Sequence, residues 1–197
     1  MLDNLPEWKK NQRKQLIAAR EAIPQSQHQQ WSRIISDNLM QRFPQLQNLT
    51  IGLYWPFRGE YDPRVVARHP LIQSATFALP EVVAKNEPLH FRQWLPDTPM
   101  KIGAYDIPVP NGTPIVRLDA IIVPMVGFDK QGYRLGYGSG YYDRTLATYS
   151  HQPLTIGVAF EIQRLENIYP QSHDISMQFI VTEAGIFETQ NHHLQAI

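Results

Sequence analysis

The chain of 197 residues contains no cysteine, which excludes a disulfide framework and a thiolate metal site. Its 18 basic and 18 acidic side chains balance, so no overall field attracts nucleic acid or an anionic membrane, and we expect neither as a partner. No apolar run approaches the length of a membrane span, and a charged amphipathic pattern stands at the N-terminus in place of a signal peptide. We therefore expect a cytoplasmic protein in which any anion-binding site is local.

Common nucleotide and metal motifs are missing as well. No Gly-Lys dipeptide occurs, which excludes a Walker loop, and the glycines do not follow the GxGxxG spacing of a dinucleotide-binding fold. The seven histidines show no HExxH or comparable ligand spacing, so we assign no zinc site. A phosphate-binding site in this chain must therefore be of another type.

The length and composition favour a single α/β domain over residues 1–197. Because 43% of the residues are hydrophobic, the chain can bury one substantial core. Sixteen prolines scattered among short segments argue against a helical bundle. Short apolar runs alternate with helical patterns, and ligands of an open parallel sheet gather at the carboxyl ends of its strands. The loops after Tyr54, Val126 and Ala159 are therefore candidate ligand-binding loops.

The periodicity predicts two N-terminal helices, over Pro6 to Ile23 and over Ser26 to about Arg42. A Ser26/Gln29 capping box opens the second helix, and Asp62 with Pro63 caps and begins a later one. The residues 96–114 carry too many breakers for regular structure. Strands are expected at Thr50 to Trp55, Ala75 to Leu79, Leu89 to Trp94, Ala120 to Val126, Leu154 to Phe160 and, as one or two strands, Phe179 to Phe187, with a helix at Gly140 to Tyr149.

The most informative segment runs from Phe128 to Arg144 and reads FDKQGYRLGYGSGYYDR. Its alternate glycines Gly136, Gly138 and Gly140 follow the apolar run Ala120 to Val126. Glycine lets successive backbone N–H groups turn inward and lets a phosphate approach where a Cβ would block it. The pattern therefore indicates an anion cradle, and a glycine-rich hairpin is the alternative for so short a motif.

Charged side chains around the glycines supply candidates for phosphate and metal binding. Arg134 and Asp143 lie within the segment, and Lys9, Arg13 and Arg20 share one stripe of the first helix with Leu16. A solvated basic face is the alternative for that stripe, and a first-turn acid that favours the helix dipole is the alternative for Asp143.

The segment Arg134 to Arg144, RLGYGSGYYDR, resembles the signature of the 5-formyltetrahydrofolate cyclo-ligase family. The resemblance extends from about Lys9 to Glu183, which is nearly the whole chain. Further matches, in chain order, are Lys9 and Arg13 (KxxxR), Tyr54, Pro56 and Glu60 (YxPxxxE), Leu79-Pro80, the PMVGFD run, Ala159, Phe160 and Gln163, His173-Asp174 and Val181-Thr182-Glu183.

The resemblance implies a Rossmann-like three-layer α/β fold with a mostly parallel central sheet (NagB/RpiA/CoA-transferase-like). It also implies an enzyme that converts 5-formyltetrahydrofolate to 5,10-methenyltetrahydrofolate with ATP and Mg²⁺, releasing ADP and phosphate. The γ-phosphoryl group would activate the formyl oxygen before N10 attacks the formyl carbon. Such a reaction needs positioning and charge neutralisation more than a protein nucleophile, which suits a chain without cysteine. We expect a monomer.

The resemblance also assigns residues to roles. The implied catalytic residues are Lys9, Arg134 and Asp143, and the implied magnesium ligands are Asp143 and Asp174. The implied ATP-binding residues are Lys9, Arg13, Arg134, Leu135, Gly136, Tyr137, Gly138, Ser139, Gly140, Tyr141 and Asp143. The implied folate-binding residues are Tyr54, Phe57, Glu60, Trp94 and Tyr142.

Several positions leave alternatives open. Ser139 stands where many family members carry glycine or lysine, and Val109 stands where many carry an acid. A folate-binding regulatory protein without turnover is therefore one alternative function. A sugar-phosphate isomerase on a related scaffold is another, because a fold and an anion cradle alone do not select a substrate. From sequence alone, Glu60 is equally an exposed loop acid, and most of the aromatic residues are equally core residues.

Overall fold

In the computed structural model, which describes residues 4–72 and 74–197, an eight-stranded sheet has the order β13-β12-β11-β9-β6-β1-β2-β3. The strands β11, β9, β6, β1 and β2 pair in parallel, and the strands beyond them at both edges pair antiparallel. The sheet consists of β1 (Thr50–Gly52), β2 (Thr76–Glu81), β3 (His90–Gln93), β6 (Ala120–Pro124), β9 (Leu154–Val158), β11 (Phe179–Thr182), β12 (Gly185–Gln190) and β13 (His193–Ala196).

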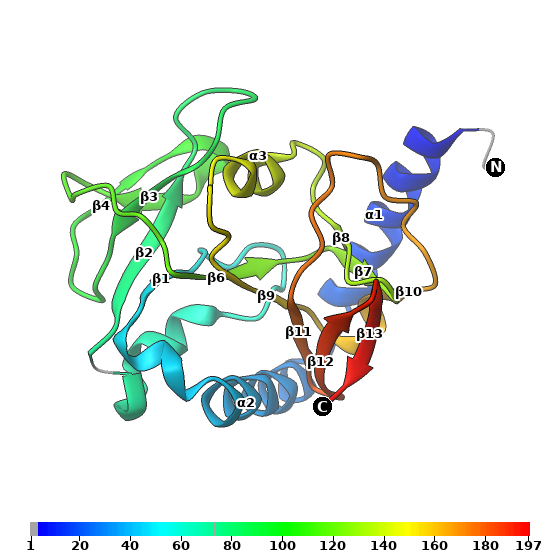
Figure 1. Cartoon of the computed structure of the whole chain (residues 1–197), viewed down its shortest axis with the longest axis horizontal. Helices are drawn as coiled ribbons and strands as arrows, with labels where there is room; N and C mark the ends of the chain where they lie inside the picture. The colour runs from blue at the N-terminus through cyan, green and yellow to red at the C-terminus, as the bar shows by residue number, and fades with distance from the viewer. Residues whose placement is uncertain (1–3, 73) are drawn as a thin grey trace.

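Helices cover both faces of this sheet, α2 (Gln25–Arg42) on one and α3 (Tyr141–Ala147) on the other (Figure 1). Alternate residues of β6 face opposite layers, as the two-residue period of a strand requires. Ile122 packs in the cluster that contains α2 residues, whereas Ile121 and Val123 pack in the cluster that contains Leu146 of α3. The expected three-layer α/β fold with a mostly parallel central sheet is therefore confirmed.

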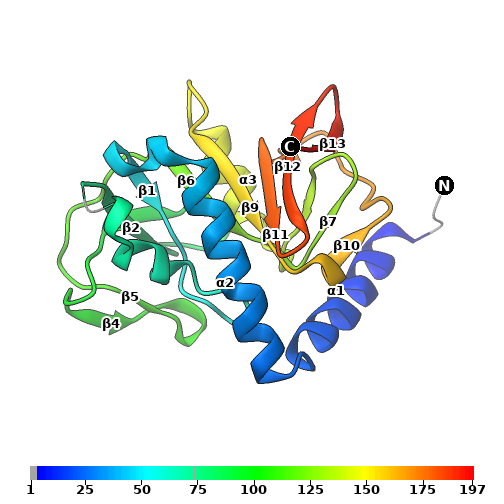
Figure 2. The ribbon, with the colours of Figure 1, turned by 90° about the horizontal axis from the view of Figure 1, so that it is seen from below.

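A smaller three-stranded sheet lies beside the central one and supports α1 (Leu5–Glu21). Its strands are β7 (Gly127–Asp129), β8 (Arg134–Leu135) and β10 (Arg164–Leu165), and Figure 2 shows α1 running alongside β7 and β10. Leu16 and Ile17 of α1 pack with Val126 and Leu135. Because this apolar face is buried, the polar stripe beside it comes to the loop that follows β8.

Two local expectations were wrong. Helix α2 begins at Gln25 after Pro24, and no side chain caps it, so the Ser26/Gln29 capping box does not form. Residues 96–114, expected to be irregular, contain the hairpin β4 (Met100–Ile102) and β5 (Pro108–Pro110). Prolines are tolerated there because the two strands form a sheet of their own, in which every strand is an edge.

Element boundaries differ by a few residues elsewhere. The strand expected from Thr50 ends at Gly52, and the helix after the glycines ends at Ala147 instead of Tyr149. Asp62 caps a short helix as expected, because its side chain accepts a hydrogen bond from the Arg64 N–H at 3.0 Å. That helix is a 3₁₀ helix. The described residues contain five such helices, at Pro44–Asn48, Pro63–Arg68, Pro70–Ile72, Ala104–Asp106 and Glu161–Gln163. None of the helices described is both long enough and apolar enough to span a bilayer.

Candidate active site

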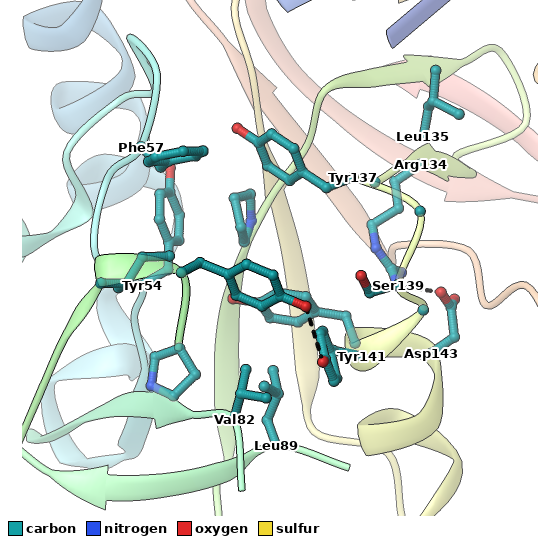
Figure 3. Close-up of a pocket in the computed structure, with 18 of the residues that line it drawn as sticks. Tyr54, Phe57, Val82, Leu89, Arg134, Leu135, Tyr137, Ser139, Tyr141 and Asp143 are labelled. Carbon is teal, nitrogen blue, oxygen red and sulfur yellow. Dashed lines mark hydrogen bonds and ion pairs between the residues drawn. The ribbon is translucent and has the colours of Figure 1, made fainter. Parts of the chain in front are cut away.

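A cavity of about 500 Å³ opens where the loops after β1 and β8 and the end of β6 meet the N-terminal half of α1. Figure 3 shows Tyr54 and Phe57 on one side, Arg134, Ser139 and Asp143 on the other, and Val82 and Leu89 below. The lining residues are Lys9, Arg13, Tyr54, Trp55, Phe57, Glu60, Pro80, Val82, Leu89, Ala104, Tyr105, Ile107, Val109, Pro124, Arg134 to Asp143, Gln171, His173 and Asp174.

The glycine loop between β8 and α3 forms one wall of the cavity. Gly138 and Gly140 have φ angles of +108° and +65°, a region that residues with a Cβ rarely adopt. The Arg13 Nε donates a hydrogen bond to the Gly136 carbonyl at 2.7 Å, and the Arg144 guanidinium donates to the Ser139 carbonyl. Two arginines therefore bind carbonyl oxygens of the loop from opposite ends.

The Arg13 side chain also faces Gly138. A Cβ built on Gly138 would lie 3.4 Å from the guanidinium carbon of Arg13. Half-burial lowers the pKa of Arg13 from its usual value, and guanidinium groups stay charged at neutral pH regardless. The cation from the first helix thus lies directly beside the middle of the loop.

Arg134, which is buried, and Asp143, which is partly buried, form an ion pair with Nη2 and Oδ2 2.6 Å apart. Arg134 is 8% exposed, so burial lowers its pKa while the carboxylate of Asp143 opposes that shift. The other oxygen of Asp143 accepts a hydrogen bond from the Ile175 N–H at 3.1 Å. Asp143 therefore connects the start of α3 to the segment before β11, which a simple first-turn acid would not do.

Lys9 and Asp174 form a second pair at the rim, with Nζ and Oδ2 3.6 Å apart. Asp174 also accepts a hydrogen bond from the Gln171 N–H at 2.8 Å. Among residues 4–72 and 74–197, no cluster of three or more His, Cys, Asp or Glu could hold a metal ion by itself. Both carboxylates expected to bind magnesium line the cavity, and each is paired with a cation.

Glu60 is a buried carboxylate in the loop after β1, with 7% of its surface exposed. One of its oxygens accepts a hydrogen bond from the Phe57 N–H at 2.8 Å, and the other accepts one from the Tyr137 hydroxyl at 2.9 Å. Arg20 lies 3.8 Å from the second oxygen. Burial raises the pKa of Glu60 to about 6, although Arg20 and the two donors each lower it.

Aromatic side chains surround this carboxylate. Tyr54 is buried and donates its hydroxyl proton to the Tyr61 carbonyl at 2.8 Å, and burial raises its pKa well above the usual value. Phe57 is 41% exposed and packs against Tyr137, with ring centroids 5.9 Å apart. A flat aromatic ligand could insert between such surfaces.

The structure brings almost all the expected site residues to this one cavity. Trp94 is the exception, because it is 4% exposed within the core cluster that contains α2 and does not line the cavity. Sequence reasoning missed Tyr105, whose hydroxyl lies 3.3 Å from that of Tyr141, because it sits in the unexpected hairpin. It also missed that Arg20 lies next to Glu60, although the shared stripe with Lys9 and Arg13 was a signal.

The fold and the cavity define an α/β protein with a two-part site at the carboxyl edge of its parallel strands, in which a glycine loop flanked by cationic side chains faces an aromatic pocket with a buried carboxylate. The sequence pattern of the 5-formyltetrahydrofolate cyclo-ligase family matches residues 6–183. The chain therefore belongs to the 5-formyltetrahydrofolate cyclo-ligase family.

Individual relatives agree with this assignment. A 5-formyltetrahydrofolate cyclo-ligase of Haemophilus influenzae is 32% identical over 158 residues, which cover 77% of this chain and 84% of the relative. The Escherichia coli K12 enzyme of the same name is 30% identical over 185 residues, covering 86% and 97%. The NMR structure of Aquifex aeolicus 5,10-methenyltetrahydrofolate synthetase has a TM-score of 0.79 at 29% identity and covers 93% of both chains. The Mycoplasma pneumoniae synthetase, at 24% identity and a TM-score of 0.73, shares the fold.

Proposed function

We propose that this protein converts 5-formyltetrahydrofolate to 5,10-methenyltetrahydrofolate and at the same time converts ATP to ADP and phosphate. The observation that carries the proposal is the union, in one cavity, of a cationic glycine loop and an aromatic pocket with a buried carboxylate. The reaction needs both halves, because a phosphoryl group must meet the formyl oxygen of the folate. We further propose that the protein acts in the cytoplasm as a monomer.

In the nucleotide half, Lys9, Arg13 and Arg134 supply positive charge around the loop from Gly136 to Tyr141. Arg13 is held by its bond to the Gly136 carbonyl, and Arg134 by its pair with Asp143. Fixed cations of this kind stabilise the charge that spreads over a transferring phosphoryl group without having to reorganise. Ser139 adds no charge, so these three side chains carry the neutralisation.

Asp143 and Asp174 would hold magnesium in this half. Mg²⁺ in ATP-dependent enzymes is usually held by one or two carboxylates together with substrate phosphates, and both of these carboxylates line the cavity. The donor set therefore fits the ion without a third protein ligand. When bound, the ion would neutralise charge on the phosphates.

In the folate half, Glu60 would accept hydrogen bonds from the N–H and amino groups of the pterin ring, since those donors match a carboxylate. Tyr54, Phe57 and Tyr142 would pack against the pterin or aminobenzoyl ring. Trp94 is left out of this set because of its place in the core.

The chemical step needs no reactant besides the two substrates. The formyl oxygen forms a bond to the γ-phosphorus as the bond from that phosphorus to ADP breaks, which gives an iminium phosphate. N10 then attacks the formyl carbon, the C–O bond breaks, phosphate leaves, and N10 loses its proton. The protein contributes by holding the two substrates in contact and by neutralising phosphate charge.

A direct assay tests the proposal. Purified protein incubated with 5-formyltetrahydrofolate, ATP and Mg²⁺ should form the methenyl chromophore and ADP in equal amounts, and neither should form when ATP is omitted. No product above background would refute the proposed reaction. Folate binding without ADP release would instead support a regulatory protein, and ATP-independent turnover of a sugar phosphate would support an isomerase.

A further inference from the structure

Arg20 is a buried arginine near the end of α1. It is 1% exposed, and a buried charge is stable only when its donors are satisfied. Its guanidinium donates to the carbonyl oxygens of Arg58 at 2.9 Å, Met125 at 3.2 Å and Phe57 at 3.4 Å, and to the Tyr137 hydroxyl at 2.7 Å. Arg20 therefore links α1 to the loop after β1, to the end of β6 and to the glycine loop.

The Tyr137 hydroxyl lies between Arg20 and Glu60. It accepts from the Arg20 Nη2 and donates to the Glu60 Oε1 at 2.9 Å, while the Phe57 N–H binds the other carboxylate oxygen. Both oxygens of Glu60 are thus fixed by donors. Figure 3 shows the Tyr137 ring extending toward the Phe57 side of the cavity, away from Asp143.

We propose that Arg20 and the Tyr137 hydroxyl are positioning groups for folate recognition, which hold the Glu60 carboxylate in one orientation for the pterin ring. The inference rests on the proposed function, because it deepens the role given there to Glu60. Tyr137 belongs to the glycine loop by sequence, and its backbone stays with the nucleotide half. Its side chain acts in the folate half of the cavity.

The charge state of Glu60 follows from the same contacts. Arg20 faces it from α1, the Phe57 N–H and Tyr54 from the loop after β1, Tyr137 from the glycine loop and Tyr142 from α3. Arg20, the Phe57 N–H and the Tyr137 hydroxyl lower the pKa of Glu60, against the larger effect of burial. Loss of Arg20 or of the hydroxyl therefore raises the pKa further and favours a protonated carboxyl, which accepts fewer hydrogen bonds.

The test is Tyr137→Phe, which removes the hydroxyl and leaves the loop backbone in place. We expect the KM for 5-formyltetrahydrofolate to rise roughly fivefold or more, as loss of a hydrogen bond to a charged group predicts, with the KM for ATP within about twofold. The acid limb of the pH profile of kcat/KM for the folate should move to higher pH. A merely structural role would shift neither the folate KM selectively nor the pH profile.

A second variant and a control complete the experiment. Arg20→Gln should change the folate KM and the pH profile in the same direction as Tyr137→Phe, whereas Lys14→Gln removes the same charge from an exposed position of α1 and should change neither. An unchanged folate KM in Tyr137→Phe, or a rise in the ATP KM instead, would overturn the inference.

Direct titration with 5-formyltetrahydrofolate in the absence of ATP separates this inference from the proposed reaction. A wild-type protein that binds the folate without turnover would refute the reaction, while a weaker Kd in Tyr137→Phe would still support the positioning role. A wild-type protein with full turnover and a Tyr137→Phe variant with unchanged Kd would refute the positioning role alone.

Discussion

Replacement of Gly138 by alanine tests whether the conformation of the glycine loop determines nucleotide binding. The φ angle of +108° at this position suits glycine, and the strain of a residue with a Cβ in such a region is about 1–3 kcal/mol. The added methyl group would lie 3.4 Å from the Arg13 guanidinium carbon, an ordinary contact, so backbone strain is the larger effect. If the loop relaxes to relieve this strain, affinity for ATP falls by a factor of roughly 5 to 150.

The assay compares the KM for ATP and the thermal midpoint of Gly138→Ala with those of Gly112→Ala. Gly112 also has a positive φ, +74°, but it does not line the cavity and a Cβ there meets no atom within 4 Å. In both variants the thermal midpoint should fall by about 2–4 °C for each kcal/mol of strain that remains in the folded protein. The ATP KM should rise in Gly138→Ala alone. A Gly138→Ala protein with both a wild-type midpoint and a wild-type ATP KM would refute the reasoning.

Three further predictions concern the charged and aromatic residues. Asp143→Asn weakens the pair with the buried Arg134, so chemical denaturation should show a fall in the unfolding free energy of up to about 3–5 kcal/mol, besides reduced turnover. Substitution of an unpaired surface acid would change the unfolding free energy by almost nothing. Burial raises the pKa of Glu60 from 4.5 to about 6, so its protonated form contributes about 2 kcal/mol to the free energy of unfolding below pH 4.5, and this contribution is lost as the pH rises through 6. Glu60→Gln should remove this decline from the pH dependence of the unfolding free energy. An identical pH dependence in both proteins would contradict the assignment. Trp94→Phe should lower the thermal midpoint while leaving the KM of both substrates unchanged. A raised folate KM would indicate that Trp94 takes part in folate binding.

The parts of the site that lie close together in sequence were predictable. The order of β6, the glycine loop and α3 follows from one apolar run and the glycines after it, because local turn chemistry fixes where the chain changes direction. The short strands β7 and β8 between β6 and the glycine loop were not expected. The Lys9 and Arg13 stripe was likewise readable from helical periodicity. The hairpin at residues 100–110 was not, since its prolines look like breakers until the two strands pair with each other.

The sequence by itself determined the alternation of helices and strands, the glycine loop with its positive φ angles, and the family, because these depend on local patterns and on one specific motif. Only the tertiary structure decided which side chains share the cavity. Trp94 lies in the core, while Arg20 and Tyr137, which are 117 residues apart in sequence, contact each other beside Glu60. The physical reason is that burial and ion pairing depend on how α1 packs against the small sheet, and no local pattern encodes that packing.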